Sequence, residues 1–365
     1  MIKDILKKNV MVLVFGAAAL VSIIIAPGGD YISYIDSELL AVMFGFMAVI
    51  AGFSESGVFK RLTAMLIHLS GNARRLTLIL VLAVFFLSML VTNDVALLTF
   101  VPFTIAVYAQ TKKSPILVIA LETIAANIGS AFTPFGNPNN LYVFTHSGMS
   151  ILDFFALMFP IVGVSLVILV IMCMTVKPEE IQLASAEKPE ISNVPYLMLY
   201  AVLFVICVLS VMGLCSPITA FASVIAVVAI CEPHLFGHID YGLLLTFAFI
   251  FVFIGNIKNI PQIADMLSTA IQGHELAATV ILSQFISNMP TTIMVSGFSD
   301  RYDAIVIGAN IGSLGTLVSS LASLISLKLY SASEGSSTGK YILVFTVLDL
   351  ILLAVLYPLS AFVIL

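Results

Sequence analysis

Four short polar segments interrupt the apolar runs of this sequence, and their residue types could bind ions. Two are tips, Thr92-Asn93-Asp94 and Ser287-Asn288-Met289-Pro290, and two are longer interruptions at residues 133–140 and 312–320. Helix ends at such breaks leave free N–H groups with positive partial charge and free C=O groups with negative partial charge. The first kind can hold an anion and the second a cation. Asn, Ser and Thr oxygens complete a shell suited to Na⁺ or to a small anion.

The candidate site consists of polar residues and glycines at these breaks. We expect Na⁺, if it binds, at Thr92, Asn93 and Asn137. Any one of these residues could equally be an ordinary helix cap or kink. The set as a whole favours a shared binding site, because matching breaks occur in both halves of the chain. The candidate substrate- or ion-binding residues are Thr92, Asn93, Asp94, Asn127, Gly129, Thr133, Gly136, Asn137, Asn139, Ser287, Asn288, Thr291, Asn310, Gly312, Thr316 and Ser319.

Three acids lie within apolar segments, where a charge is costly and therefore suggests function. Asp94 could cap a helix or couple transport to a cation or proton. Glu122 is a candidate proton carrier, or it could bond a neighbouring Thr or Asn. Asp349 is expected to pair within the scaffold. Alignment of the two halves places Met289 opposite Asp94 and Ile305 opposite Glu122, so these acids predict an asymmetric coupling site in the first half.

No Lys or Arg lies at a tip or break, and the closest is Lys328. An anion would therefore be held by helix N-termini, amide side chains and a co-bound cation rather than by an arginine clamp. The four cysteines lack metal-ligand spacing and are expected to be packing residues. We expect no resident cofactor, with Na⁺ or H⁺ as the coupling ion.

The elements that carry these residues belong in a bilayer. Of 365 residues, 61% are apolar and 10% charged, and the mean hydropathy is +1.15, whereas soluble domains carry about a quarter charged residues. The sequence predicts an all-α polytopic membrane protein with re-entrant hairpins at 76–109 and 275–298. The predicted spans are about 10–27, 35–53, 114–146 (broken), 151–176, 193–212, 217–231, 240–256, 301–331 (broken) and 341–363.

The positive charges agree with this layout. With the N-terminus in the cytoplasm, 13 Lys and Arg residues fall inside and only Lys258 and Arg301 fall outside. The inside residues are at positions 3, 7, 8, 60, 61, 74, 75, 112, 113, 177, 188, 328 and 340. The count supports the parity of the crossings and a cytoplasmic N-terminus, without distinguishing a re-entrant hairpin from two full spans.

An internal repeat sets the architecture. Residues 126–130 (Ala-Asn-Ile-Gly-Ser) recur at 309–313, an offset of 183 that also relates Thr133 to Thr316. The tips match at an offset of 195, and Ile35-Asp36 matches Ile239-Asp240 at 204. Five predicted spans separate position 53 from position 256, so the repeats are expected to be inverted. We divide the chain into a first helix (1–34), repeat 1 (35–176), a linker with connecting helices (177–239) and repeat 2 (240–365).

These motifs resemble the ion transporter superfamily, which includes arsenite permeases, divalent anion–sodium symporters and citrate transporters. Residues 91–97 and 287–291 are similar to the two hairpin tips of the arsenite-permease branch, and residues 136–140 are similar to the Gly-[Asp/Thr/Asn]-Pro-x-Asn loop of the clan. Both tips depart from the Ser-Asn-Thr of the symporters. The resemblance implies a scaffold domain, often dimeric, and a moving transport domain that works by alternating access on a Na⁺ or H⁺ gradient.

We therefore expect a secondary active transporter of a small anion or oxyanion-like solute, such as a carboxylate, an inorganic anion or arsenite, in the plasma membrane. The alternative is a sodium/proton antiporter that uses Asp94 and Glu122. An intramembrane enzyme is not expected, since serine, metal and aspartate protease motifs are absent, and neither is a pump, since there is no phosphate loop. A channel would differ by failing to accumulate solute uphill. The expected partners are the lipid bilayer, a small-molecule anion or cation and a second copy of the chain, with no nucleic acid.

Overall fold

Helices make up the regular structure of this protein. The computed structural model describes residues 10–27, 29–67, 71–110, 113–180 and 193–365, and over these ranges it contains no strand, only an isolated bridge between Asn72 and Glu180. The prediction of an all-α fold is confirmed. Five of the basic residues counted above, at positions 3, 7, 8, 112 and 188, lie outside the described ranges.

Long apolar helices identify a multi-pass membrane protein. Within the described ranges five helices are long and apolar enough to cross a bilayer. They are α3 (Ser37–Glu55), α9 (Ile151–Met174), α10 (Val194–Val211), α12 (Tyr241–Lys258) and α18 (Thr338–Leu359), which continues into η3 (Ser360–Ile364). Two shorter apolar helices accompany them, α2 (Val10–Ile25) and α11 (Pro217–Cys231), and the short η1 (Pro233–His238) leads into α12.

Both predicted hairpins are helix pairs with a sharp tip. The first consists of α5 (Ala73–Leu87) and α6 (Asn93–Ala109), and the second of α14 (Glu275–Ile286) and α15 (Asn288–Ser296). The first begins before residue 76, because the side chain of Asn72 accepts a hydrogen bond from the Arg75 N–H and caps α5. Each hairpin is preceded by a short amphipathic helix, α4 (Val58–Ile67) or α13 (Pro261–Ile271).

Both predicted broken helices are interrupted where expected. The first consists of α7 (Ile116–Ser130) and α8 (Pro138–Ser147). The second consists of α16 (Tyr302–Ile311), the single turn η2 (Leu317–Ser319) and α17 (Leu321–Ser331). Proline cannot continue a helix from its N-terminal side, so Pro138 fits only as the first residue of α8. In the second break Gly315 has a φ of +113°, which a residue with a side chain rarely adopts.

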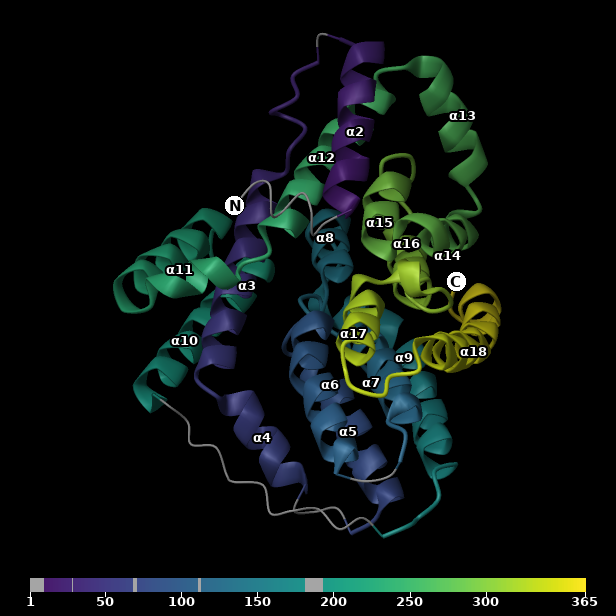
Figure 1. The fold of residues 1–365 in the computed structure, drawn as a ribbon. Helices are drawn as coiled ribbons and strands as arrows, with labels where there is room; N and C mark the ends of the chain where they lie inside the picture. Colours follow the sequence, from purple (N-terminus) through teal and green to yellow (C-terminus); the bar gives the residue numbers. More distant parts are fainter. Residues whose placement is uncertain (1–9, 28, 68–70, 111–112, 181–192) are drawn as a thin grey trace.

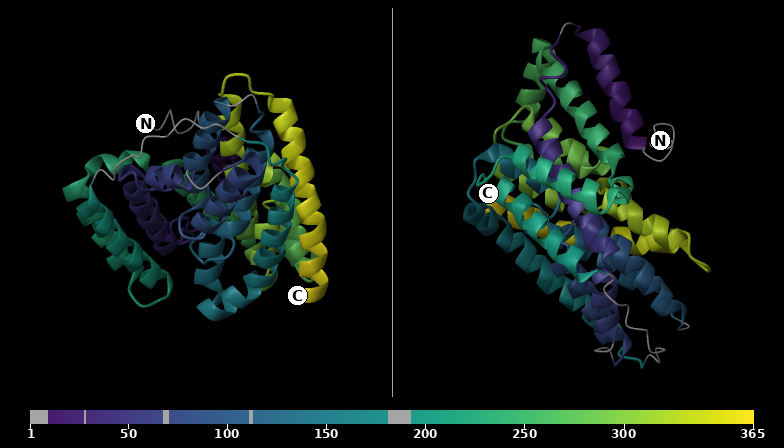
Figure 2. Two further views of the ribbon diagram at one scale, coloured as in Figure 1. Left: turned by 90° about the horizontal axis from the view of Figure 1, so that it is seen from below. Right: turned by 90° about the vertical axis from the view of Figure 1, so that its left-hand side faces the viewer.

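The helices form two packed groups (Figure 1). In one group α10 and α11 lie against α3, while α2 lies against α12. The other group contains the hairpins and the broken helices, with α18 against α7 and α9. Viewed from below, α10 and α11 form one edge of the molecule and α18 forms the opposite edge (Figure 2). Within the second group the broken helices exchange partners, because α7 packs on α17 while α8 packs on α16.

The contact between α3 and α10 allows a test of the first group. A methyl group at Gly52 would lie 2.6 Å from the ring of Tyr200, which is buried and donates a hydrogen bond to Glu232. We expect Gly52→Ala to destabilise the protein by about 1–3 kcal/mol through overpacking, and so to lower its melting temperature in detergent. Gly163→Ala is the control, because nothing lies within 4 Å of the added methyl group. Equal melting of both variants would contradict this packing.

Candidate functional site

Two asparagines that precede the breaks hold the broken helices together. The Asn127 side-chain oxygen accepts a hydrogen bond from the Ser320 hydroxyl (3.0 Å), and its amide donates to the Ser323 hydroxyl (3.2 Å). Asn310, its counterpart at the offset of 183, accepts from the Asn137 amide (3.0 Å) and donates to Asn140 (2.7 Å). The partners follow the same offset, since residues 137 and 140 map onto 320 and 323. Such a reciprocal exchange is what an approximate two-fold relation between the halves produces.

The hairpins are fastened to the breaks by equivalent bonds as well. Thr133 donates from its hydroxyl to the carbonyl of Met89 (2.6 Å), and Thr316 donates to the carbonyl of Gln284 (3.0 Å). Residues 89 and 284 are related by the offset of 195 found at the tips. The side chain of Gln284 also donates to the carbonyls of Gly312 and residue 314, and so satisfies backbone oxygens that the second break leaves free.

The candidate glycines allow this close packing. A methyl group at Gly129 would lie 2.2 Å from the Phe85 carbonyl oxygen and 2.4 Å from the Ser88 hydroxyl. At Gly312 it would lie 3.0 Å from the hydroxyl of Ser283, the counterpart of Ser88, and at Gly136 it would lie 2.3 Å from the carbonyl oxygen of residue 130. Each glycine therefore lets two backbone segments approach inside the protein.

Three helix N-termini at the breaks lack a side-chain cap. They belong to α6, α15 and α17, whose N-cap residues Thr92, Ser287 and Ser320 make no capping hydrogen bond, whereas α8 is capped by Asn137. Asn93 and Ser320 both donate to the side-chain oxygen of Asn127. The Ser287 hydroxyl lies 3.5 Å from the carbonyl oxygen of residue 319. The starts of these three helices are therefore linked to residues 319–320, and positive helix ends close to one another favour a bound anion. In α6 the Asp94 N–H already donates to the side-chain oxygen of Asn93 (3.1 Å).

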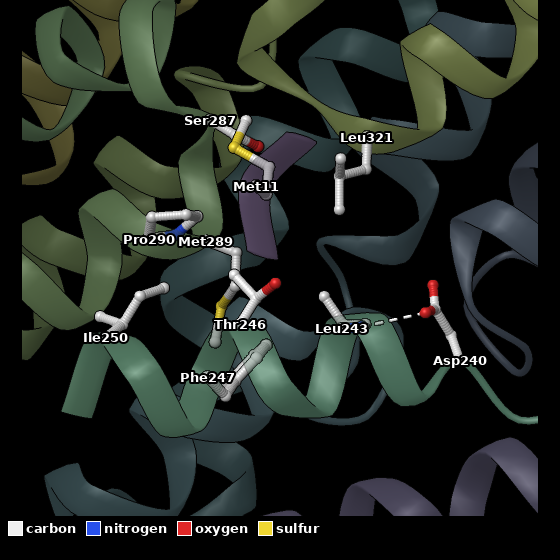
Figure 3. Close-up of a pocket in the computed structure, with 10 residues that line it drawn as sticks. All are labelled: Met11, Asp240, Leu243, Thr246, Phe247, Ile250, Ser287, Met289, Pro290 and Leu321. Carbon is white, nitrogen blue, oxygen red and sulfur yellow. Dashed lines mark hydrogen bonds between the residues drawn. The ribbon is translucent and has the colours of Figure 1, made fainter. Parts of the chain in front are cut away.

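The second tip also has a strained backbone. Ser287 has φ +71° and ψ 151°, and it is the one non-glycine residue with positive φ in the described part of the chain. Such a conformation costs of order 1–3 kcal/mol and persists only where the surroundings enforce it. Ser287 lies beside Leu321, Met289 and Pro290 in a small cavity whose other wall is α12 (Figure 3).

A larger cavity of about 340 Å³ lies at the first tip. Its polar lining includes Thr92 and Asp94 from the tip, Glu55 from the end of α3, His238 from the end of η1 and Asp240 at the N-cap of α12. The remaining lining is mostly apolar, and among the described residues it includes no Lys or Arg. Carboxylate and hydroxyl oxygens without a nearby Lys or Arg are suited to a hard cation.

Asp94 faces this cavity from the first turn of α6. The cap position belongs to Thr92, so the interpretation of Asp94 as a helix cap is wrong. Asp240, from the second half of the chain, faces the same cavity, so the acids that line it are not confined to the first half. Asp240 caps α12 by accepting a hydrogen bond from the Leu243 N–H (2.9 Å), as Figure 3 shows.

The other two membrane acids lie away from the cavities. Glu122 is fully buried and accepts a 2.5 Å hydrogen bond from Thr104, as the alternative for this residue predicted. Its second oxygen, Oε2, has no hydrogen-bond partner among the described residues. Asp349 accepts a hydrogen bond from the Gly315 N–H (3.2 Å), so it supports the second break instead of pairing elsewhere in the scaffold.

The remaining predicted residues lie at the tips and breaks in separate environments. Asn288 donates to the carbonyl of residue 309 (3.4 Å), which parallels the bond of Asn93 to Asn127. The Thr291 hydroxyl donates a hydrogen bond to the carbonyl of Ser287 at the start of its own helix. The Ser319 hydroxyl donates to the carbonyls of residues 313 and 316. Asn139 is buried with an oxygen that has no partner in the described structure, which leaves it available to a ligand.

The proposed sodium ligands are only partly brought together. Thr92 lines the cavity with Pro138, while Asn93 and Asn137 are engaged in separate bonds to Asn127 and Asn310. Sequence reasoning also missed several residues of the network. Ser320, Ser323 and Asn140 could have been found by applying the offset of 183 to the whole break. Asp240 and Gln284 are brought to the site only by the packing of α12 and of the second hairpin.

Comparisons with known proteins agree with this architecture. The family described as "Citrate transporter" (CitMHS) matches residues 2–299. The chain is 30% identical over 300 residues to the inner membrane protein YbiR of Escherichia coli, covering 81% of this chain and 80% of that protein. It is 31% identical over 278 residues to an uncharacterized transporter, MJ0456, of Methanocaldococcus jannaschii, covering 75% of each. The solved YdaH transporter of Alcanivorax borkumensis shares the fold with a TM-score of 0.55 at 16% identity, covering 89% of this chain and 84% of that one.

The exchanged hydrogen bonds predict equivalent effects in the two halves. Asn127→Ala and Asn310→Ala each remove bonds to the opposite half, and buried side-chain bonds in membrane proteins contribute about 0.6 kcal/mol each. We expect both variants to lower the melting temperature by similar amounts. Adding Ser320→Ala to Asn127→Ala should cost less than Ser320→Ala alone, because the shared bond is already lost. Ser165→Ala is the control, since this buried hydroxyl bonds its own helix. Strict additivity of the pair would contradict the network.

Proposed function

Because the chain belongs to the citrate transporter family, we propose that it is an ion-coupled secondary active transporter of a small anion or oxyanion-like solute, working by alternating access. The family and the transporters it resembles make transport the activity to expect, rather than catalysis. The observation that carries the proposal is the meeting of three uncapped helix N-termini around residues 319–320. A carboxylate, an inorganic anion or arsenite offers the oxygens that these N–H groups would bind.

The coupling cation belongs in the neighbouring cavity. Asp94 and Asp240 face it from different halves of the chain. Thr92 also lines the cavity, and it is the N-cap of α6, one of the helix ends that would contact the anion. An anion bound beside two carboxylates requires a positive charge between them, because the described residues that line the cavity include no Lys or Arg. Na⁺ or H⁺ would supply it, so that anion and cation stabilise each other's binding.

A second candidate function is sodium/proton antiport. The cavity favours it, since acids from both halves can exchange a cation for protons without any anion. In this scheme Asp94 would be the exchanging group that faces the cavity, while Glu122 would require a separate path because it lies outside the cavity and is fully buried. The free helix N-termini have no role in antiport, and they are the reason to prefer an anion carrier.

We propose the domain organisation, the membrane orientation and the assembly together with this function. The halves act as inverted repeats, with α2, α3 and α10–α12 as the scaffold and the hairpins and broken helices as the moving part. The chain lies in the plasma membrane with its N-terminus in the cytoplasm, and it works as a homodimer. The matched hydrogen bonds of the two breaks support the repeat, and the basic residues support the orientation.

Binding can be measured by thermal shift on the purified protein. Na⁺, Li⁺, citrate, succinate, phosphate, sulfate and arsenite would be tested singly and in pairs, with a pH series. A ligand at about 100 times its Kd stabilises the folded state by about 2.7 kcal/mol. We expect one anion and one cation to stabilise the protein together far more than either alone. Stabilisation by cations alone, with no effect of any anion, would favour antiport instead.

Transport by a variant tests Asp94, which both candidate functions use. Asp94→Asn should abolish cation-driven accumulation of the anion in proteoliposomes, because the coupling carboxylate is lost while the side-chain size is kept. Asp153→Asn is the control, since Asp153 is a surface residue in the first turn of α9. Full activity of Asp94→Asn would remove Asp94 from coupling and with it the antiport scheme. Flux that never exceeds the equilibrium level in the wild-type protein would indicate a channel.

A further inference from the structure

Helices α3 and α8 are open to a cavity at one end and joined to each other at the opposite end. The cavity at the first tip is lined by residues 47–55 in the second half of α3 and by Pro138 at the start of α8. At the far ends of the two helices, Asp36 caps α3 and His146 lies in the last turn of α8. The 19 residues of α3 span about 28 Å. Met47, the first cavity residue along α3, follows Asp36 by 11 residues, or about 16 Å of helix, so the contact between Asp36 and His146 lies away from the cavity.

Asp36 and His146 form an ion pair between the two helix groups. His146 Nε2 lies 3.2 Å from Asp36 Oδ2, while Asp36 Oδ1 accepts a hydrogen bond from the Leu39 N–H (3.0 Å). His146 Nδ1 lies 2.8 Å from the carbonyl oxygen of Tyr142. A carbonyl and a carboxylate both accept hydrogen bonds, so the doubly protonated imidazolium is the form that donates to both.

The pair is reinforced by the second hairpin. The ring of His146 lies 4.4 Å, centroid to centroid, from the ring of Tyr142 on the same helix. The hydroxyl of Tyr142 is 2.8 Å from the hydroxyl of Ser296 in the last turn of α15. One cluster thus joins α3 to both the first broken helix and the second hairpin.

The counterpart of Asp36 in the second half is in a different situation. Asp240 caps α12 as Asp36 caps α3, with the bonded N–H three residues on in both cases. Asp36 is paired with α8, but Asp240 lines the cavity with Ile325 of α17, the counterpart of α8. No ion pair to Asp240 occurs among the described residues. Asp36 thus lies at the end where α3 is joined to α8, and its counterpart Asp240 lies at the end that is open to the cavity.

We infer that the Asp36–His146 pair is a gate latch, which keeps one end of the protein closed while the cavity at the other end is open. The inference rests on the alternating access of the proposed function. For the closed end to open, α8 must separate from α3, and the ion pair must break. With the predicted topology, the latch lies on the outer side and the cavity opens toward the cytoplasm.

Labelling of a single cysteine tests the latch. Val95 lines the cavity close to the tip, so Val95→Cys in a background without the four native cysteines reports which side has access. An impermeant thiol reagent would be applied to each face of oriented membrane vesicles. With the latch intact, labelling should come predominantly from one face. Asp36→Asn and His146→Gln should each raise labelling from the other face about fivefold, the order expected for loss of one partly exposed ion pair.

The variants are matched to isolate the ion pair. Asn is as good a helix cap as Asp, so Asp36→Asn removes the charge and keeps the cap of α3. His146→Lys keeps a positive charge opposite Asp36 and should restore one-sided labelling. Asp303→Asn is the control, because it breaks the Arg301–Asp303 pair, which does not join α3 to α8. Its labelling should match that of the parent protein.

The outcomes are distinct from those of the transport assays. Unchanged one-sided labelling in both Asp36→Asn and His146→Gln would overturn the latch. Labelling from the original face, together with the melting temperature, shows that a variant is folded, and if one variant fails this check the other decides. The assay needs no substrate, so absence of transport in proteoliposomes would reject the proposed function while leaving the labelling result interpretable.

Discussion

A helix that stops inside a bilayer leaves backbone N–H and C=O groups that no water can satisfy, and the contacts around both breaks respond to this constraint. Gln284 satisfies carbonyls of the second break, and Asn140 donates to the carbonyls of residues 130, 131 and 133 in the first. Asn127 and Asn310 then tie each broken helix to the opposite one. The interrupted backbone is stable only because the two halves complete each other, so the breaks, the hairpins and the site form one structural unit.

One sequence difference between the halves changes what the network can do. Asn137 uses its oxygen to cap α8 and its amide to reach Asn310, because an amide carries both an acceptor and donors. Its counterpart Ser320 has a single hydroxyl, which donates to Asn127 and leaves α17 uncapped. The exchanged bond is kept in both halves, but of the helices that follow the two breaks only α17, in the second half, has an uncapped N-terminus. An anion site can therefore be asymmetric even though the framework that carries it is duplicated.

The sequence predicts the framework well because its signals are local. Apolar runs, prolines and the repeated Asn-Ile-Gly-Ser motif place the hairpins and breaks close to their observed bounds, and the offset of 183 identifies Asn127 and Asn310 as a pair. Contacts between segments that are distant in the sequence are harder to predict. The glycines resembled ligand positions, yet Gly129 and Gly312 are required by the approach of α5 and α14. Asp240 resembles an ordinary helix cap in sequence, and only the packing of α12 near the first hairpin brings it to Asp94. Such side chains depend on three-dimensional packing that one sequence does not specify.

The same reasoning explains how a duplicated framework could adopt two states. If the halves were identical in sequence and environment, Asp36 and Asp240 would have equivalent partners. They do not, because α8 carries His146 at the position where α17 carries Leu329, and Asp240 forms no ion pair among the described residues. One end is thus closed by an ion pair that has no equivalent at the other end in this conformation, where Lys328 is the basic residue in the last turn of α17. A difference of one partly exposed ion pair is small compared with the stability of a folded protein. It biases the two conformations without locking either, which is the energetic condition that alternating access requires.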